Sequence, residues 1–265
     1  MAAEEPTRSL LFALDDDPHG LGLGLDLPDG HLIDDPKGTA DDPPLYWVSE
    51  DETDAEEWAE VNAHAARTGL RPILLDDLVD EDLSPSTTQS APGDHDAEDV
   101  LALWWEEWHA DSDDDPDDQP EWPGLADALP VEADPEACAR EALEDLEGSD
   151  LFEEPLLALV PAARSADIPA LLGWDGAINL EDDPGRLSAV LRSWEDRFGA
   201  RLVALGPDTL VVSVAAPPRT VDQALAIAAE HYAFCPDNVD QGEHGNLEEY
   251  ADWLVGRGYW TFWWD

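Results

Sequence analysis

One short segment near the end of the chain brings together side chains that can do chemistry. The segment EHYAFCPDNVDQG, residues 230–242, holds a glutamate, a histidine, a cysteine, two aspartates and an asparagine. A histidine one helical turn before a cysteine can act as the base that activates a thiol nucleophile. His231, Cys235 and Asp237 also offer three types of metal ligand, although without the paired spacing of a zinc motif. The segment is therefore a candidate catalytic or metal site.

The residues before this segment have the pattern of a helix that begins near Thr220. At 100° per residue, Val221, Leu225 and Tyr232 share one face, which we expect to pack on a sheet. Glu230 points nearly opposite to that face, so we expect it to be solvated. The segment then reads as the end of a packed helix.

Two features favour a structural role for the cysteine. Pro236 disfavours helical geometry at Cys235, so the chain should turn there. A nucleophilic cysteine needs an electropositive, exposed setting, and the acidic surroundings here would raise the pKa of the thiol. We expect a buried cysteine followed by a turn. The alternative is a hydrolase-like site of His231, Cys235 and Asp237, edged by Arg192.

No other motif adds a cofactor or metal. The chain has no Gly-rich phosphate loop, no serine nucleophile elbow and no HExxH, so we expect no cofactor. The aspartate-rich loop at 111–124 lacks the Gly and Glu that an EF-hand needs at its sixth and twelfth positions, which hold Pro116 and Trp122. Arg192 and Asp196 are expected to form an exposed i,i+4 ion pair. The tryptophans of LWWEEWH, residues 103–109, are expected to lie in the core, with a partner-binding role as the alternative.

The charge is extreme and unevenly distributed. The 265 residues carry a formal net charge of -52, of which residues 1–160 contribute -42 from 47 acids and 5 bases. Such a field repels nucleic acids and anionic membranes and attracts basic proteins. Adaptation to high salt is the alternative explanation. We therefore expect no direct nucleic-acid partner and leave both origins of the acidity open.

The cysteines and hydropathy favour a reduced cytoplasm. Only Cys138 and Cys235 are present, the N-terminus lacks a secretory signal pattern, and no apolar run approaches the ~18 residues of a membrane span. We expect a cytoplasmic protein with no membrane segment.

Hydrophobic periodicity predicts an α+β fold in two parts. Residues 1–155 should form a smaller acidic α/β region with loops at about 84–96 and 111–124, and alternating leucines at 21–27 indicate a strand. Residues 156–265 should form a C-terminal domain with the order β-α-β-β-α-β and a four-stranded sheet backed by helices. Pro184 and Gly199 mark the two ends of its first helix.

The C-terminal part also resembles a known family. The stretches LRSWEDRFGARLVALGPDTLVVSVAAPP, AAEHYAFCPDN and the final FWWD resemble the domain-of-unknown-function family 4253, which occurs in bacteria and often in actinomycetes. The resemblance covers about residues 157–265. It implies a domain boundary and a bacterial cytoplasmic origin, and it transfers no catalytic residue.

Two hypotheses of function follow. The first is a non-enzymatic acidic interaction protein, immunity-like in the sense that it neutralises a basic partner such as a toxin or a nucleic-acid-binding protein. The second is a hydrolase-like enzyme that uses the C-terminal His, Cys and Asp side chains.

Overall fold

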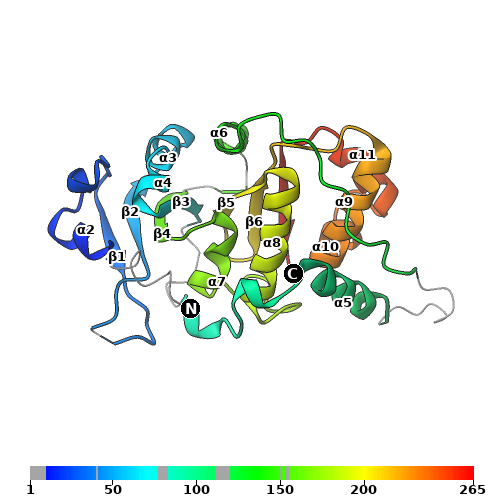
Figure 1. The fold of residues 1–265 in the computed structure, drawn as a ribbon, viewed down its shortest axis with the longest axis horizontal. Coiled ribbons are helices and arrows are strands. Elements are labelled where there is room, and N and C mark those ends of the chain that lie inside the picture. The colour runs from blue at the N-terminus through cyan, green and yellow to red at the C-terminus, as the bar shows by residue number, and fades with distance from the viewer. Residues whose placement is uncertain are drawn as a thin grey trace.

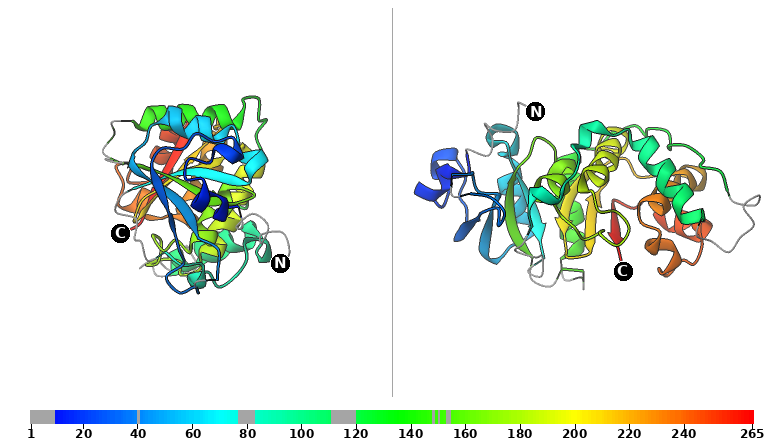
Figure 2. Two further views of the ribbon diagram at one scale, coloured as in Figure 1. Left: turned by 90° about the vertical axis from the view of Figure 1, so that its left-hand side faces the viewer. Right: turned by 90° about the horizontal axis from the view of Figure 1, so that it is seen from below.

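The computed structural model of the protein describes residues 10–39, 41–76, 83–110, 120–147, 149, 151–152 and 155–265. Its centre is a seven-stranded mixed sheet with helices on both faces, so the fold is α+β (Figures 1 and 2). The strands are β1 (Gly30–Ile33), β2 (Tyr46–Glu52), β3 (Leu70–Leu75), β4 (Leu156–Pro161), β5 (Arg201–Leu205), β6 (Thr209–Ser213) and β7 (Tyr259–Trp263).

The sheet combines strands from both parts of the chain. Its order is β1-β2-β4-β3-β5-β6-β7, and every neighbouring pair is antiparallel except β3 and β5. The separate four-stranded C-terminal sheet is not found, because β3 lies between β4 and β5. The apolar runs predict which segments are strands but not their pairing. Both β3 and β4 are buried along most of their length. This burial fits their central positions in the sheet, where both faces are covered.

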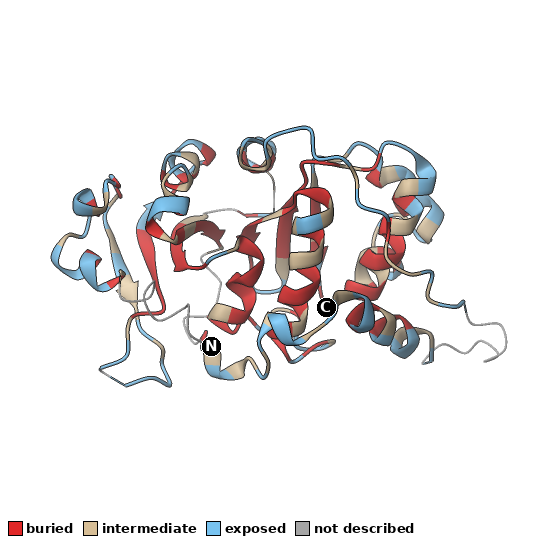
Figure 3. Ribbon diagram, in the orientation of Figure 1, coloured by how far each residue is buried: buried red, intermediate tan, exposed pale blue. Residues whose placement is uncertain are grey.

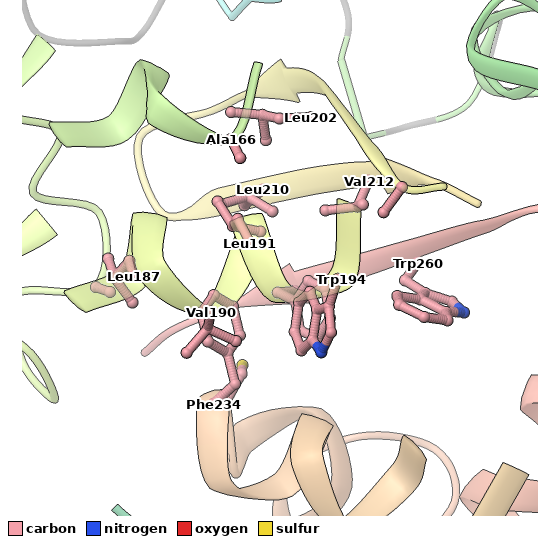
Figure 4. Packing of buried hydrophobic residues seen from close by; sticks show 14 of the residues in the cluster. Ala166, Leu187, Val190, Leu191, Trp194, Leu202, Leu210, Val212, Phe234 and Trp260 are labelled. Atoms are coloured by element: carbon pink, nitrogen blue, oxygen red, sulfur yellow. The ribbon is translucent and has the colours of Figure 1, made fainter. Parts of the chain in front are cut away.

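One face of the sheet carries the larger core. Alternate residues of β3, for example Ile73 and Leu75, point to this face, and the helices over it pack against the sheet. Figure 4 shows Leu187, Val190 and Trp194 along one helix beside the sheet, with Phe234 of another helix next to Val190. The helices on this face are α5 (Ala97–Ala110), α7 (Ile168–Leu172), α8 (Pro184–Phe198), α9 (Val221–Phe234), α10 (Asp237–Asp240) and α11 (Leu247–Leu254).

The opposite face carries a second core. Leu74 of β3 and Val211 of β6 point to this side and meet Trp58 and Leu143 from the covering helices. These helices are α2 (Phe12–Asp16), α3 (Ala55–Asn62), α4 (Ala65–Thr68) and α6 (Pro135–Leu146). The buried residues form a continuous band through both layers, and the outer faces of the helices are exposed (Figure 3).

The two helices predicted in the C-terminal part are confirmed. Helix α8 begins after Asp183, whose side chain accepts a hydrogen bond from the Gly185 amide, and ends at the left-handed Gly199. Helix α9 begins after Thr220, whose side chain accepts from the Gln223 amide. The predicted hairpin between β5 and β6 and the terminal strand β7 are also present.

The strand predicted at residues 21–27 is wrong. Leu21–Leu23 form a 3-10 turn, called η1, between Gly20 and Gly24, which both have left-handed backbone angles. Leu25 and Leu27 are buried without belonging to a strand. The alternating leucines therefore belong to a loop that turns at two glycines, and the first strand lies further along the chain.

The predicted loop at 84–96 follows the surface of the larger core. It contains two short 3-10 turns, η2 (Pro85–Thr87) and η3 (Pro92–Asp94). Asp183 holds it, because the carboxylate accepts hydrogen bonds from the Gln89 and Ser90 amides at 3.0 and 3.4 Å. A Cβ at Gly185 would lie 2.2 Å from the Ser90 carbonyl oxygen, so glycine is needed for this close approach.

Two further observations complete the fold. The aspartate-rich residues 111–119, among them Pro116, lie outside the described residues, whereas Trp122 is partly buried against the larger core. Within the described part of the chain, no helix is both long and apolar enough to cross a membrane. The remaining 3-10 turn, η4 (Ser165–Asp167), precedes α7.

Candidate functional site

The candidate segment lies beside the edge strand of the sheet. Strand β7 is the last in the sheet order, and it pairs only with β6. The short α10 contacts its other side, and Cys235 at the end of α9 bonds to it there. The backbone groups of alternate β7 residues therefore face the segment rather than another strand.

Side chains of the segment bind this strand edge. The Asn238 amide nitrogen donates to the Thr261 carbonyl at 2.6 Å, and its oxygen accepts from the Trp263 amide at 3.3 Å. The Cys235 thiol donates to the Trp263 carbonyl at 3.0 Å. Just beyond β7, the Asp265 amide donates to the Asp237 carboxylate at 3.2 Å. These bonds occupy the groups that an exposed strand edge would offer to another chain.

The cysteine is placed as an interior residue. Cys235 is fully buried, and its thiol lies 3.5 Å from the Asn238 side-chain oxygen as well as against Trp263. Burial strongly raises the pKa of this thiol. The sulfur is therefore held as a neutral hydrogen-bond donor, whereas a nucleophile requires the thiolate.

The histidine is directed to a tyrosine rather than to the thiol. His231 is fully buried, and its Nδ1 lies 3.0 Å from the Tyr250 hydroxyl. The Asn238 amide donates to the same hydroxyl at 3.4 Å. The hydroxyl oxygen can accept a second hydrogen bond as well as donate one, so the tautomer of His231 decides which of the two groups donates. The side chains of His231 and Cys235 are thus linked through Tyr250 and Asn238, and the direct hydrogen bond between these two residues is that of the Cys235 amide to the His231 carbonyl.

The histidine is also neutral. Its ring packs 4.4 Å from the Trp260 ring and 4.9 Å from that of Phe262, centroid to centroid. Burial, assisted by the positive charge of Arg197, lowers the pKa of His231 well below its usual value. The Nε2 atom has no hydrogen-bond partner within the described residues. The tyrosine is similarly neutral, since burial raises the pKa of Tyr250.

The expectation that Glu230 is solvated is wrong. Glu230 is fully buried and forms a two-pronged ion pair with Arg197, in which both N···O distances are 2.6 Å. The carboxylate also accepts from the Trp194 indole at 2.8 Å and the Ala126 amide at 2.7 Å. All of these bonds join α8, α9 and the segment before α6. The ion pair is therefore part of the interior.

The predicted packing face of α9 is also wrong. Val221 and Leu225, predicted to pack on the sheet, are 46% and 41% exposed, whereas Glu230 and His231 are buried. The sequence ALAIAAEHYAF is apolar nearly all round, so its periodicity is a weak guide to the buried face. A glutamate in such an apolar helix indicates a buried carboxylate that needs a positively charged partner. Arg197 is that partner.

Arg192 is not part of this group. It pairs with the buried Asp167 at the start of α7. Its predicted partner Asp196 instead binds Arg164 at 2.6 Å. The structure thus places Cys235 and Asp237 at the edge of β7 and His231 against the rings of its Trp260 and Phe262, whereas Arg192 is paired with Asp167 at the start of α7. Their catalytic role stays a prediction.

No metal centre is formed by the candidate ligands. Among the residues that the structure describes, no group of three or more His, Cys, Asp or Glu side chains is placed to hold a metal ion. Cys138, the second cysteine, lies half-buried on α6, and both cysteines are free. Of the tryptophans predicted to lie in the core, Trp104 and Trp105 are buried, and Trp108 is partly buried against it.

A different hollow lies on the other face of the sheet. A cavity of about 350 Å³ is formed between the start of α3, the end of α6 and the sheet. We call it the α3–α6 pocket. Its apolar lining residues are Ala55, Leu74, Leu143, Leu146, Phe152, Pro155 and Ala204, and its polar ones are Glu52, Thr53, Asp54, Glu147 and Ser149. This pocket could not be predicted from local sequence patterns, because it depends on how distant elements pack together.

The comparisons with known proteins support the family of the C-terminal part. Residues 156–265 match a family described as a domain of unknown function, DUF4253. No curated protein matches the chain, and no solved structure does. The fold therefore defines an α+β protein, the match to this family covers residues 156–265 alone, and it assigns no activity.

Proposed function

We propose that this protein binds a basic protein partner through the acidic surface of its N-terminal part, as a non-enzymatic, immunity-like factor. The observation that carries the proposal is how the chain uses its positive charges. Each of the ten arginines within the described residues makes a hydrogen bond, ion pair or ring contact inside the chain: Arg67, Arg71, Arg140, Arg164, Arg186, Arg192, Arg197, Arg201, Arg219 and Arg257. The acids greatly outnumber these cations.

The surplus acids face solvent on neighbouring elements. At the end of β2, the residues Glu50, Asp51 and Glu52 are all exposed. The exposed Glu56 and Glu60 follow on α3. Helix α3 packs beside α6, which exposes further acids. This surface can steer a positively charged protein toward the chain and repels nucleic-acid phosphates.

Capture of partners at two salt concentrations tests the proposal. The immobilised protein should retain a basic protein at about 50 mM salt and release it at about 500 mM, because salt screens exposed charges over distances of about 3–10 Å. Partners whose binding is insensitive to salt, or that are not basic, would count against the proposal.

Matched variants assign the binding to a surface. In the first variant, Glu50→Gln, Glu56→Gln and Glu60→Gln remove three exposed charges from β2 and α3. The control removes three exposed charges from α11, through the substitutions Glu248→Gln, Glu249→Gln and Asp252→Asn. The first variant should weaken capture much more than the control. Equal effects would show that net charge alone matters.

A further inference from the structure

The α3–α6 pocket joins an apolar interior to an acidic mouth. Its interior is formed by Leu143 and Leu146 from α6, Leu74 and Ala204 from the sheet, and Phe152. These residues belong to or border the second core, so the pocket opens directly onto packed hydrophobic side chains. An apolar group that enters it leaves water for an apolar environment.

The mouth of the pocket carries three exposed carboxylates, those of Glu52, Asp54 and Glu147. Two of them are fixed by the start of α3. Asp54 accepts from the Glu57 amide at 2.9 Å, and Glu147 accepts from the Ala55 amide at 3.0 Å. No lysine or arginine lines the pocket within the described residues. The mouth is thus negative, and hydrogen bonds hold the carboxylates of Asp54 and Glu147 in place.

We propose that this pocket receives an apolar side chain of the basic partner, with neighbouring lysines or arginines of the partner lying against the carboxylates at the mouth. The inference rests on the proposed function and adds the anchoring point. Charge complementarity selects the occupant, since a cationic segment matches the mouth and an anionic membrane is repelled by it. The buried anchor surrounded by charges is the usual arrangement of an interface centre and its polar rim.

Two fluorescent peptides test the pocket directly. One is a pentapeptide with phenylalanine between two pairs of lysines, and the other has serine at the central position. Both should bind the protein in a salt-sensitive manner, and the phenylalanine peptide should bind about tenfold tighter or more, because its ring is buried. Fluorescence anisotropy measures both affinities.

A blocking variant locates the effect. Ser149→Trp places a large side chain at the pocket lining, and Ala137→Trp adds the same side chain to an exposed position on α6 outside the lining. The preference for phenylalanine should persist in Ala137→Trp and disappear in Ser149→Trp. The circular dichroism spectrum of each variant confirms folding.

The outcomes separate the two proposals. Equal, salt-sensitive binding of both peptides to the unmodified protein would overturn the pocket and leave the acidic surface supported. A phenylalanine preference that survives in a folded Ser149→Trp would also overturn the pocket. If neither peptide binds at low salt, both proposals fail.

Discussion

At the scale of single residues, the interior holds polar and charged side chains that bind one another rather than water. Glu230, Arg197 and Trp194 satisfy one another around a buried carboxylate. His231 and Tyr250 form a second buried group, held neutral by burial. Such groups are costly when one member is removed, because the remaining partner stays buried without compensation.

The substitution Glu230→Gln should therefore destabilise the protein strongly. It leaves the Arg197 charge largely buried without its counter-ion, which costs about 3 kcal/mol or more of unfolding free energy. Urea denaturation measures the change. The exposed Glu248→Gln on α11 is the control and should change stability by less than about 0.5 kcal/mol. Similar effects of the two substitutions would contradict the buried ion pair.

His231 should make stability depend on pH. Its pKa is lowered in the folded protein, while the unfolded chain keeps a value near 6.5. Below about pH 6.5 the unfolded state therefore binds a proton that the folded state does not, and stability falls as the pH falls. Protonation of the unfolded chain at a pKa near 6.5 limits the loss from this residue between about pH 7 and pH 5 to at most about 2 kcal/mol. In His231→Gln this contribution to the pH dependence of stability should be absent. The carboxylates should contribute equally to the pH dependence of the unmodified protein and the variant.

Cys235 should resist thiol reagents in the folded state. Its sulfur is buried, and burial raises the pKa of the thiol. In a Cys138→Ser background, mass spectrometry should detect labelling of Cys235 only after urea unfolds the protein. Fast labelling of the native protein at neutral pH would favour the hydrolase-like alternative with His231 and Asp237.

At the scale of elements, α10 acts as a cover for the edge of β7. Asn238 supplies both an acceptor and a donor to the strand, as a neighbouring strand would. Without this cover, the sheet would end in free amide and carbonyl groups, which promote pairing between chains.

Asn238→Ala should open this edge. Loss of the two hydrogen bonds to Thr261 and Trp263 should lower the unfolding free energy by about 1–3 kcal/mol. Hydrogen exchange at the Trp263 amide should accelerate. Gln241→Ala, on the exposed end of α10, is the control and should leave that amide protected. Unchanged exchange at Trp263 in Asn238→Ala would contradict the role of this side chain.

Local signals predicted the elements better than their partners. Capping residues and prolines marked α8 and α9 correctly, because these effects act within one turn of the helix. The positions of β3 between β4 and β5 and of Arg197 beside Glu230 depend on contacts between distant segments. The sequence therefore predicted that Cys235 is buried and followed by a turn, and it missed what Asn238 and Glu230 bind.

At the scale of the whole molecule, the sheet joins the two parts of the chain. Strand β3 pairs with β4 over six residues and with β5 on its other side. A fragment of residues 156–265 would lack β3 and leave a gap in the sheet. We expect this fragment to be unfolded or aggregated by circular dichroism and size-exclusion chromatography. A folded, monomeric fragment would support the domain boundary predicted near residue 155 and contradict this account of the sheet.

At this scale the charge of the molecule leads to the central proposal, that the acidic surface binds the partner and the buried His–Cys segment does not take part. The most direct measurement compares the affinity of a captured basic partner for two variants. Cys235→Ser removes the thiol and keeps a donor toward Trp263, whereas the triple substitution at Glu50, Glu56 and Glu60 removes surface charge. We predict that Cys235→Ser binds the partner like the unmodified protein and that the triple variant binds at least about tenfold more weakly, the equivalent of about 1.4 kcal/mol. Loss of binding in a folded Cys235→Ser, with the triple variant unaffected, would contradict the account.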